Sequence, residues 1–183
     1  GGYDPVTGVE PHRNPIDPVV GRTAPEWDAV IAGLPTVADP WPPLGPLVLV
    51  APHPDDELLA AGATLAAASD AGTEVRVVAV TDGEMSHPHL DDAGRRQLVD
   101  RRLAETAAAY TAAGIVADRH RLSLPDGDTT DHADRLVEGL LSFLEGAAAC
   151  LAPWEADGHP DHDACGRAAL KACAVLGVPV FSF

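Results

Sequence analysis

The sequence predicts an α/β fold built on a mostly parallel sheet. From residue 47 onward, short apolar runs such as Leu47–Ala51 alternate with longer segments rich in Ala and Leu. Apolar runs of this length favour buried strands, and the longer segments favour helices. Strands that alternate with helices form β-α-β units, whose strands run parallel and whose crossovers are right-handed. The 183 residues are enough for one such domain.

The predicted elements follow one another in a regular order. Strands are expected at 47–51, 74–80, 119–122, 148–152 and 178–183, and helices at 57–70, 93–113, 131–146 and 160–175. Gly72, Gly114 and Gly177 each follow a helical segment, as is typical of helix ends. The chain stops within the last predicted strand, so we expect the native sequence to continue past Phe183.

Residues 1–46 differ in composition from the rest of the chain. They hold more than half of the seventeen prolines and show almost no apolar periodicity. One short helix is expected from Pro25 to Leu34, because proline suits a first turn and Gly33 lies near the end. We therefore expect a proline-rich arm over 1–46 that wraps the domain, and an α/β domain over 47–183.

Charge and composition exclude several classes of function. The formal net charge is −16, from 28 acidic and 12 basic residues. This charge disfavours a nucleic acid or an anionic membrane as partner. No apolar stretch is long enough to span a membrane, and the first residues do not resemble a signal peptide. Cys150, Cys165 and Cys173 lack the spacing of a metal knuckle, which favours free thiols in the cytoplasm. The sequence specifies no oligomeric state.

Polar clusters follow three of the predicted strands. They are His53/Asp55/Asp56/Glu57 after the first strand, Thr81–Glu84 after the second, and Asp157–His162 after the strand at 148–152. The carboxyl ends of parallel strands meet at one edge of a sheet, where ligands bind. Imidazole and carboxylate groups that meet there are typical ligands of a divalent metal.

The spacing within two clusters supports a catalytic metal site. His53 and Asp56 are three residues apart at the entrance of a helix, and so are His159 and His162. Two histidine nitrogens and one carboxylate oxygen leave coordination positions open, as in catalytic zinc sites. Asp55 lies beside this set and is free to act as a general base.

Each of these residues also has a simpler structural interpretation. Asp56, Glu57 and Asp161 all fall in the first turn of a predicted helix, where acidic side chains interact favourably with the helix dipole. A single histidine on a helix is more often a surface or core residue than a ligand. The metal hypothesis therefore depends on both clusters occurring together at strand ends.

The two clusters carry a family resemblance. Pro52-His53-Pro54-Asp55-Asp56-Glu57 together with His159-Pro160-Asp161-His162 resembles the GlcNAc-phosphatidylinositol de-N-acetylase superfamily, also called PIG-L or LmbE-like. Thr81–Glu84, Arg102-x-x-Glu105 and Leu124–Gly127 resemble weaker motifs of this family, in the family's order. The resemblance implies a Rossmann-like three-layer sandwich. It also implies zinc-dependent removal of an N-acetyl or other N-acyl group from an amino sugar or related small molecule.

The resemblance assigns roles to the residues that match. His53, Asp56 and His162 would bind one zinc ion per chain, or another divalent metal. Asp55 would be the general base that activates a zinc-bound water. His159 would stabilise the tetrahedral oxyanion and could protonate the leaving amine.

Four further residues are candidate substrate contacts. Arg102 could bind sugar hydroxyls, Trp154 could form an aromatic wall, and Asp157 and His87 could line the site. Each has a structural alternative: an ion pair for Arg102, loop packing for Trp154 and a solvated loop for His87. Asp157, or else Asp161, could instead orient a histidine.

Two other functions remain open from the sequence. One is a zinc amidase or esterase that acts on a non-sugar secondary metabolite. The other is a non-catalytic protein that retains the fold and the metal. The Ala- and Pro-rich composition is typical of a high-GC bacterial source and fits a small N-acylated substrate.

Overall fold

The computed structural model describes residues 23–33, 41 and 43–183, and the chain divides into two compact units, 1–38 and 39–183. In the first unit, the described residues form α1 (Ala24–Ala32), which Gly33 ends. At its start, the backbone N–H of Thr23 donates to Glu26 at 2.7 Å. This confirms the short helix expected there. The arm predicted over 1–46 falls largely outside the described residues and stays a prediction.

The second unit alternates strands and helices as the sequence predicts. In chain order the elements are β1 (Leu47–Ala51), α2 (Asp56–Asp70), β2 (Val75–Thr81), α3 (Asp92–Ala113), β3 (Asp118–Leu124), the 3-10 turn η1 (Thr129–His132), α4 (Ala133–Leu144), β4 (Ala149–Ala152), α5 (Pro160–Leu176) and β5 (Val180–Ser182). The main difference lies in the helix expected at 131–146. A 3-10 turn occupies its start, and α4 ends at Leu144, before Gly146 turns the chain with a φ of 72°.

The five strands form one parallel sheet in the order β3-β2-β1-β4-β5. This confirms the predicted Rossmann-like α/β fold. β1 is central, with Leu49 opposite Val77 of β2 on one side and Leu151 of β4 on the other. The strand order reverses between β1 and β4, and ligands of such sheets bind at the carboxyl ends of the two strands that flank this point.

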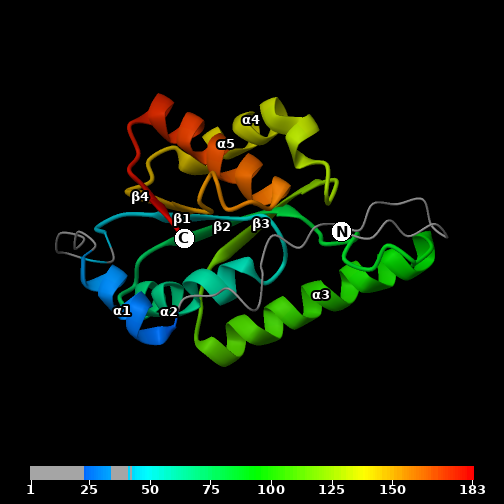
Figure 1. Ribbon diagram of the computed structural model, residues 1–183, viewed down its shortest axis with the longest axis horizontal. Coiled ribbons are helices and arrows are strands. Elements are labelled where there is room, and N and C mark those ends of the chain that lie inside the picture. The colour runs from blue at the N-terminus through cyan, green and yellow to red at the C-terminus, as the bar shows by residue number, and fades with distance from the viewer. Residues whose placement is uncertain (1–22, 34–40, 42) are drawn as a thin grey trace. The chain divides into compact units, whose positions relative to one another are not determined.

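Helices cover both faces of the sheet. Figure 1 shows α2 and α3 on one side, and α4 and α5 on the other. Successive side chains of β1 alternate between these layers: Leu49 packs in a cluster with Leu65 of α2, and Val50 packs with Leu140 of α4. Because both faces are buried, β1 is apolar throughout. The first polar groups therefore appear where the strand ends, at the edge that holds the site.

Two expectations about composition can be compared with the structure. Cys150, Cys165 and Cys173 are free and buried, where they pack in the core as small apolar side chains. Among the described helices, none combines the length and apolar character that crossing a bilayer requires.

Candidate metal centre

Two loops at neighbouring strand ends bring the predicted ligands together. The turn Pro52–Asp55 leads from β1 into α2, and residues 153–159 lead from β4 into α5. The second loop packs tightly against α5 at Gly166. A side chain there would begin 2.5 Å from the carbonyl oxygen of Pro153 and 2.8 Å from the backbone nitrogen of Glu155. Glycine permits this close approach of the loop to α5. In the first turn of α5, Nε2 of His162 lies 3.3 Å from Oδ2 of Asp56 at the start of α2.

His53, Asp56 and His162 form a group that can hold one metal ion. One ligand atom from each lies within 4.8 Å of the others. Oδ2 of Asp56 lies 3.4 Å from Nδ1 of His53 and 3.3 Å from Nε2 of His162. Zinc with bonds of about 2.1 Å has tetrahedral ligands about 3.4 Å apart. The donor types and these separations fit zinc or a similar divalent ion.

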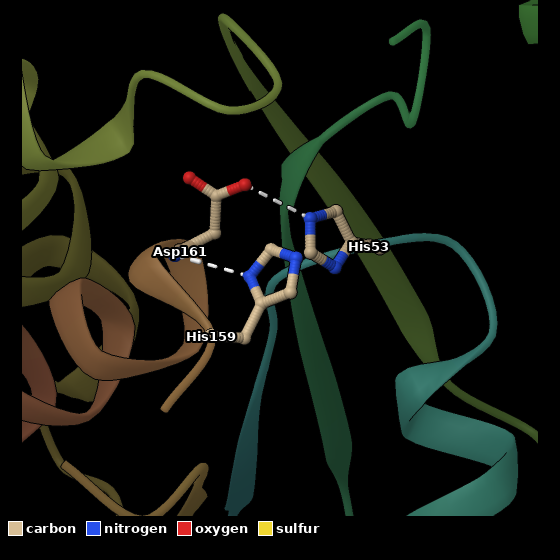
Figure 2. A group of neighbouring side chains, drawn as sticks. All are labelled: His53, His159 and Asp161. Atoms are coloured by element: carbon tan, nitrogen blue, oxygen red, sulfur yellow. Dashed lines mark hydrogen bonds and ion pairs between the residues drawn. The ribbon is translucent and has the colours of Figure 1, made fainter. Parts of the chain in front are cut away.

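The second nitrogen of each candidate histidine ligand faces a carboxylate. Nε2 of His53 lies 3.0 Å from Oδ2 of Asp161 (Figure 2) and 3.3 Å from Oδ1 of Asp126. Nδ1 of His162 lies 3.1 Å from Oδ2 of Asp157. Histidines that bind metals usually donate their other N–H to such a carboxylate, which fixes the tautomer and the ring orientation. The arrangement leaves Nδ1 of His53 and Nε2 of His162 as the two nitrogens that face Asp56.

A second group, His53, His159 and Asp161, also meets the distance criterion for a metal. Figure 2 shows Asp161 pointing at His53, with the ring of His159 beside them. Asp161, however, is buried and already accepts hydrogen bonds from Thr129 Oγ1 at 2.6 Å and Gly127 N at 3.0 Å. Because its oxygens are occupied by these donors, Asp161 fits an orienting role better than a ligand role.

The electrostatics of the centre favour a cation. Burial lowers the pKa of His53, but three neighbouring carboxylates outweigh this effect and raise the pKa to about 11. They belong to Asp126, Asp161 and Asp56, in that order. Burial raises the pKa of Asp56, but its hydrogen bonds to His162 and His53 bring it well below the ordinary value. A metal ion satisfies the same excess of negative charge as a bound proton.

Asp55 lies beside the ligands in a strained conformation. Its φ is 146°, which non-glycine residues rarely adopt and which concentrates at functional sites. Burial raises the pKa of its carboxyl, while the Arg102 guanidinium, 3.1 Å away, lowers it; the net shift is upward. The carboxylate is therefore a stronger base than an ordinary aspartate, which suits the acceptance of a proton.

His159 caps α5 next to the two histidine ligands. Its Nδ1 accepts a hydrogen bond from the backbone N–H of Asp161 at 3.3 Å (Figure 2). Burial lowers the pKa of His159, and the charges on His53 and His162 lower it further. A neutral ring whose Nδ1 accepts must carry its proton on Nε2, so Nε2 is free to donate to an oxyanion.

The four candidate substrate contacts lie in different environments. Arg102 donates to Pro54 O at 2.8 Å and to Asp55, so much of its guanidinium is used within the protein. Trp154 is 53% exposed, and its backbone N–H donates a hydrogen bond to the carbonyl oxygen of Phe183 at 2.9 Å. His87 is exposed and pairs with Ser86 at 3.2 Å. Asp157 is bonded to His162, as described above.

The chain matches a known protein family. The model of the GlcNAc-PI de-N-acetylase family, PIG-L, matches residues 48–173. The chain belongs to the PIG-L family. The match includes both loops of the candidate metal centre and, apart from Leu47, every strand except β5.

Named PIG-L relatives are deacetylases. The diacetylchitobiose deacetylase of Thermococcus kodakarensis is 27% identical over 150 residues, which cover 80% of this chain and 55% of the relative. The 1D-myo-inositol 2-acetamido-2-deoxy-alpha-D-glucopyranoside deacetylase 1 of Catenulispora acidiphila is 30% identical over 175 residues, covering 78% and 54%. The chain thus spans about half the length of these relatives.

Solved structures show the same fold. The N,N'-diacetylchitobiose deacetylase from Pyrococcus horikoshii aligns with a TM-score of 0.59 at 25% identity, covering 70% of this chain and 49% of that one. A triple mutant of a deacetylase in the teicoplanin biosynthetic pathway aligns with a TM-score of 0.60 at 27% identity, covering 74% and 62%. A 4-carboxy-2-hydroxymuconate hydratase from Pseudomonas putida, 19% identical over 72% of this chain and 57% of its own, shares the fold with a TM-score of 0.58.

Asp126 faces the candidate metal centre, which the sequence did not predict. The sequence marked Pro125-Asp126-Gly127 only as a turn and a weak motif. In the structure its carboxylate lies 3.3 Å from His53 and accepts from Met85 N at 2.8 Å. Its position just after β3, at the carboxyl edge of the sheet, is the sequence signal that could have identified it.

Proposed function

We propose that this protein is a metal-dependent N-deacetylase, a hydrolase that removes an acetyl group from an amino sugar or a related small metabolite. The observation that carries the proposal is the spacing of His53, Asp56 and His162 around one point, with Asp55 beside them. Zinc is the proposed metal. The names of the PIG-L relatives, which act on diacetylchitobiose and on an acetamido glucopyranoside, support the proposed substrate class.

The proposed mechanism assigns one task to each residue. A zinc ion held by His53, Asp56 and His162 would act as a Lewis acid that lowers the pKa of water to about 7 and polarises the acyl oxygen. Asp55 takes a proton from the attacking water, whose oxygen forms a bond to the acyl carbon. Nε2–H of His159 donates to the oxygen that becomes negative.

Collapse of the tetrahedral intermediate formed by this attack completes the hydrolysis. The C–N bond breaks, and the proton held by Asp55, or one from His159, passes to the leaving amine. The acyl group leaves as a carboxylate. Because one water is consumed and no electrons are transferred, the reaction needs no further co-reactant.

Four residues are proposed as substrate contacts. The exposed ring of Trp154 offers a flat apolar face to a sugar, and Arg102, Asp157 and His87 offer polar groups. The net charge of −16 supports a small substrate without several negative charges. Free, buried cysteines support a cytoplasmic location.

A secondary metabolite is the second candidate substrate. The observation in its favour is the likeness to a deacetylase of the teicoplanin biosynthetic pathway. The same residues would then act as an amidase or esterase on a larger acylated product. A panel that contains both kinds of substrate distinguishes the two.

The test combines metal analysis with acetate release. The panel holds diacetylchitobiose, N-acetylglucosaminides including the inositol glycoside, acetyl esters and acylated glycopeptides. Asp55→Asn should keep the metal and lose about 10²–10⁴-fold in rate, the usual contribution of a general base. Asp134→Asn, at a side chain 96% exposed on α4, is the matched control. Bound metal without hydrolysis of any panel member would contradict the proposal.

A further inference from the structure

The peptide unit that precedes Asp55 is held from both sides. Its carbonyl oxygen, from Pro54, accepts a hydrogen bond from Nη2 of Arg102 at 2.8 Å. Its N–H, from Asp55, donates to Oε2 of Glu57 at 3.1 Å. This peptide plane sets the φ of Asp55, which is 146°. A residue in so sparsely populated a region keeps its conformation only where the surrounding contacts hold it.

Glu57 is a buried carboxylate with a defined set of donors. The side chain has no exposed surface. Oε1 accepts from Nε of Arg119 on β3 at 3.0 Å and from the hydroxyl of Tyr110 on α3 at 3.3 Å. Oε2 faces the N–H of Asp55. A first-turn acid that served only the helix dipole would remain solvated, because burying a carboxylate is costly unless it is paired.

We propose that Glu57, with the largely buried Arg119 as its counter-ion, is a positioning residue that fixes the direction of the Asp55 carboxylate. The inference rests on the proposed function, in which Asp55 is the general base. Glu57 holds the N–H of the peptide unit and Arg102 holds the carbonyl. Arg102 also contacts the Asp55 carboxylate directly, whereas Glu57 contacts only the backbone N–H of Asp55. A change at Glu57 therefore tests how the backbone conformation of Asp55 affects its carboxylate.

The first test is Glu57→Gln, which keeps the shape of the side chain. A carboxamide has only one acceptor oxygen, and the cation of Arg119 should attract it. The NH₂ group then faces the N–H of Asp55, which loses its acceptor. We expect kcat to fall about 10- to 100-fold, as small misplacements of catalytic groups do. KM and metal content should not change. Glu74→Gln is the control, since it removes the charge from a 2.6 Å ion pair with Arg76 at the opposite edge of the sheet.

A second pair of variants keeps the test decisive if Glu57→Gln does not fold. Glu57→Gln/Arg119→Leu and Glu57→Met/Arg119→Leu both remove the buried charges, and they differ in whether an acceptor faces Asp55. In the first, the amide oxygen can accept from Asp55 while its NH₂ donates to Tyr110. We expect the Gln variant to keep kcat within about tenfold of wild type and the Met variant to lose about 10- to 100-fold more.

Crystal structures of these variants provide a readout that does not depend on activity. We expect the φ of Asp55 to stay near 146° in the Gln double variant and to leave this region in the Met double variant. Equal kcat values for the two double variants, or an unchanged φ in the Met variant, would overturn the positioning role. If wild type hydrolyses no substrate, the deacetylase proposal fails while the φ of Asp55 still tests the role of Glu57.

Discussion

The two loops that form the candidate metal centre hold their residues in different ways. The β1–α2 turn presents His53 and Asp56 from a short segment, and Asp56 Oδ2 accepts from the His53 backbone N–H at 2.9 Å. The loop between β4 and α5 is longer, and it depends on packing at Gly166 and on a hydrogen bond from Trp154 to Phe183. The side chains of the two candidate ligands from the turn are largely buried, whereas the loop relies on backbone contacts and on more exposed side chains, such as Asp157. Changes in the turn should therefore cost more than matched changes in the loop.

The largest expected difference is between the two histidine ligands. His53→Ala removes a proposed ligand and leaves the carboxylates of Asp126 and Asp161 without their common partner. His162→Ala removes a ligand whose outer carboxylate, Asp157, is 42% exposed and can be solvated. We expect both to lose more than about 100-fold in metal affinity, because outer carboxylates alone account for about 10- to 100-fold. His53→Ala should lose more.

Metal content after dialysis against a graded chelator measures this difference. Asp134→Asn serves again as the control, since its side chain lies at an exposed site on α4. Unchanged metal content in both histidine variants would contradict the ligand assignment.

The outer carboxylates give the next largest effect. Asp161→Asn replaces an acceptor that is completely buried, and Asp157→Asn replaces one that is partly exposed. We expect the first to weaken metal binding about 10- to 100-fold and the second to weaken it less. Titration of each metal-free variant with zinc measures both affinities. Equal losses would show that the burial of an outer carboxylate does not determine how much it contributes to metal binding.

Acid should destabilise the metal-free protein through the largely buried carboxylates that face the two histidines. Although burial raises the pKa of Asp56 in the turn and of Asp161 in α5, their histidine partners hold both below the ordinary value of 3.8. A depressed pKa in the folded state means that the stabilisation is present above about pH 3.8 and is lost as the pH falls. Urea unfolding between pH 5 and pH 3 should show a declining free energy of unfolding. The decline should be shallower in Asp161→Asn, and an identical slope would contradict this assignment.

The smallest expected effect is a change in loop packing. Gly166→Ala places a methyl group 2.5 Å from the carbonyl oxygen of Pro153, so the loop or α5 must shift. We expect a loss of about 1–3 kcal/mol in the free energy of unfolding, as is usual for overpacking. Thermal unfolding and acetate release measure the two consequences. Gly62→Ala, where a methyl group meets no atom within 4 Å, is the control and should keep wild-type stability.

Features set by local sequence signals were predicted more accurately than features set by tertiary contacts. The strand Leu47–Ala51 was predicted with its observed ends, because an apolar run followed by Pro52 is a local signal. The α-helix expected from about residue 131 begins two residues later, at Ala133, because a 3-10 turn over Thr129–His132 precedes it. The side chain and backbone N–H of Thr129 both bond Asp161, which is far away in the sequence. No local pattern indicates such a tertiary contact.

The sequence by itself determined the α/β class and the placement of His53, Asp56 and His162 at strand ends. These follow from periodicity and from the order of apolar and polar residues, which are local properties of the chain. Only the tertiary structure decided that β4 lies beside β1, that Nδ1 of His53 is the nitrogen facing Asp56, and that Glu57 is buried against Arg119. The physical reason is that strand order and hydrogen-bond partners depend on contacts between distant segments, and these exist only once the sheet has formed.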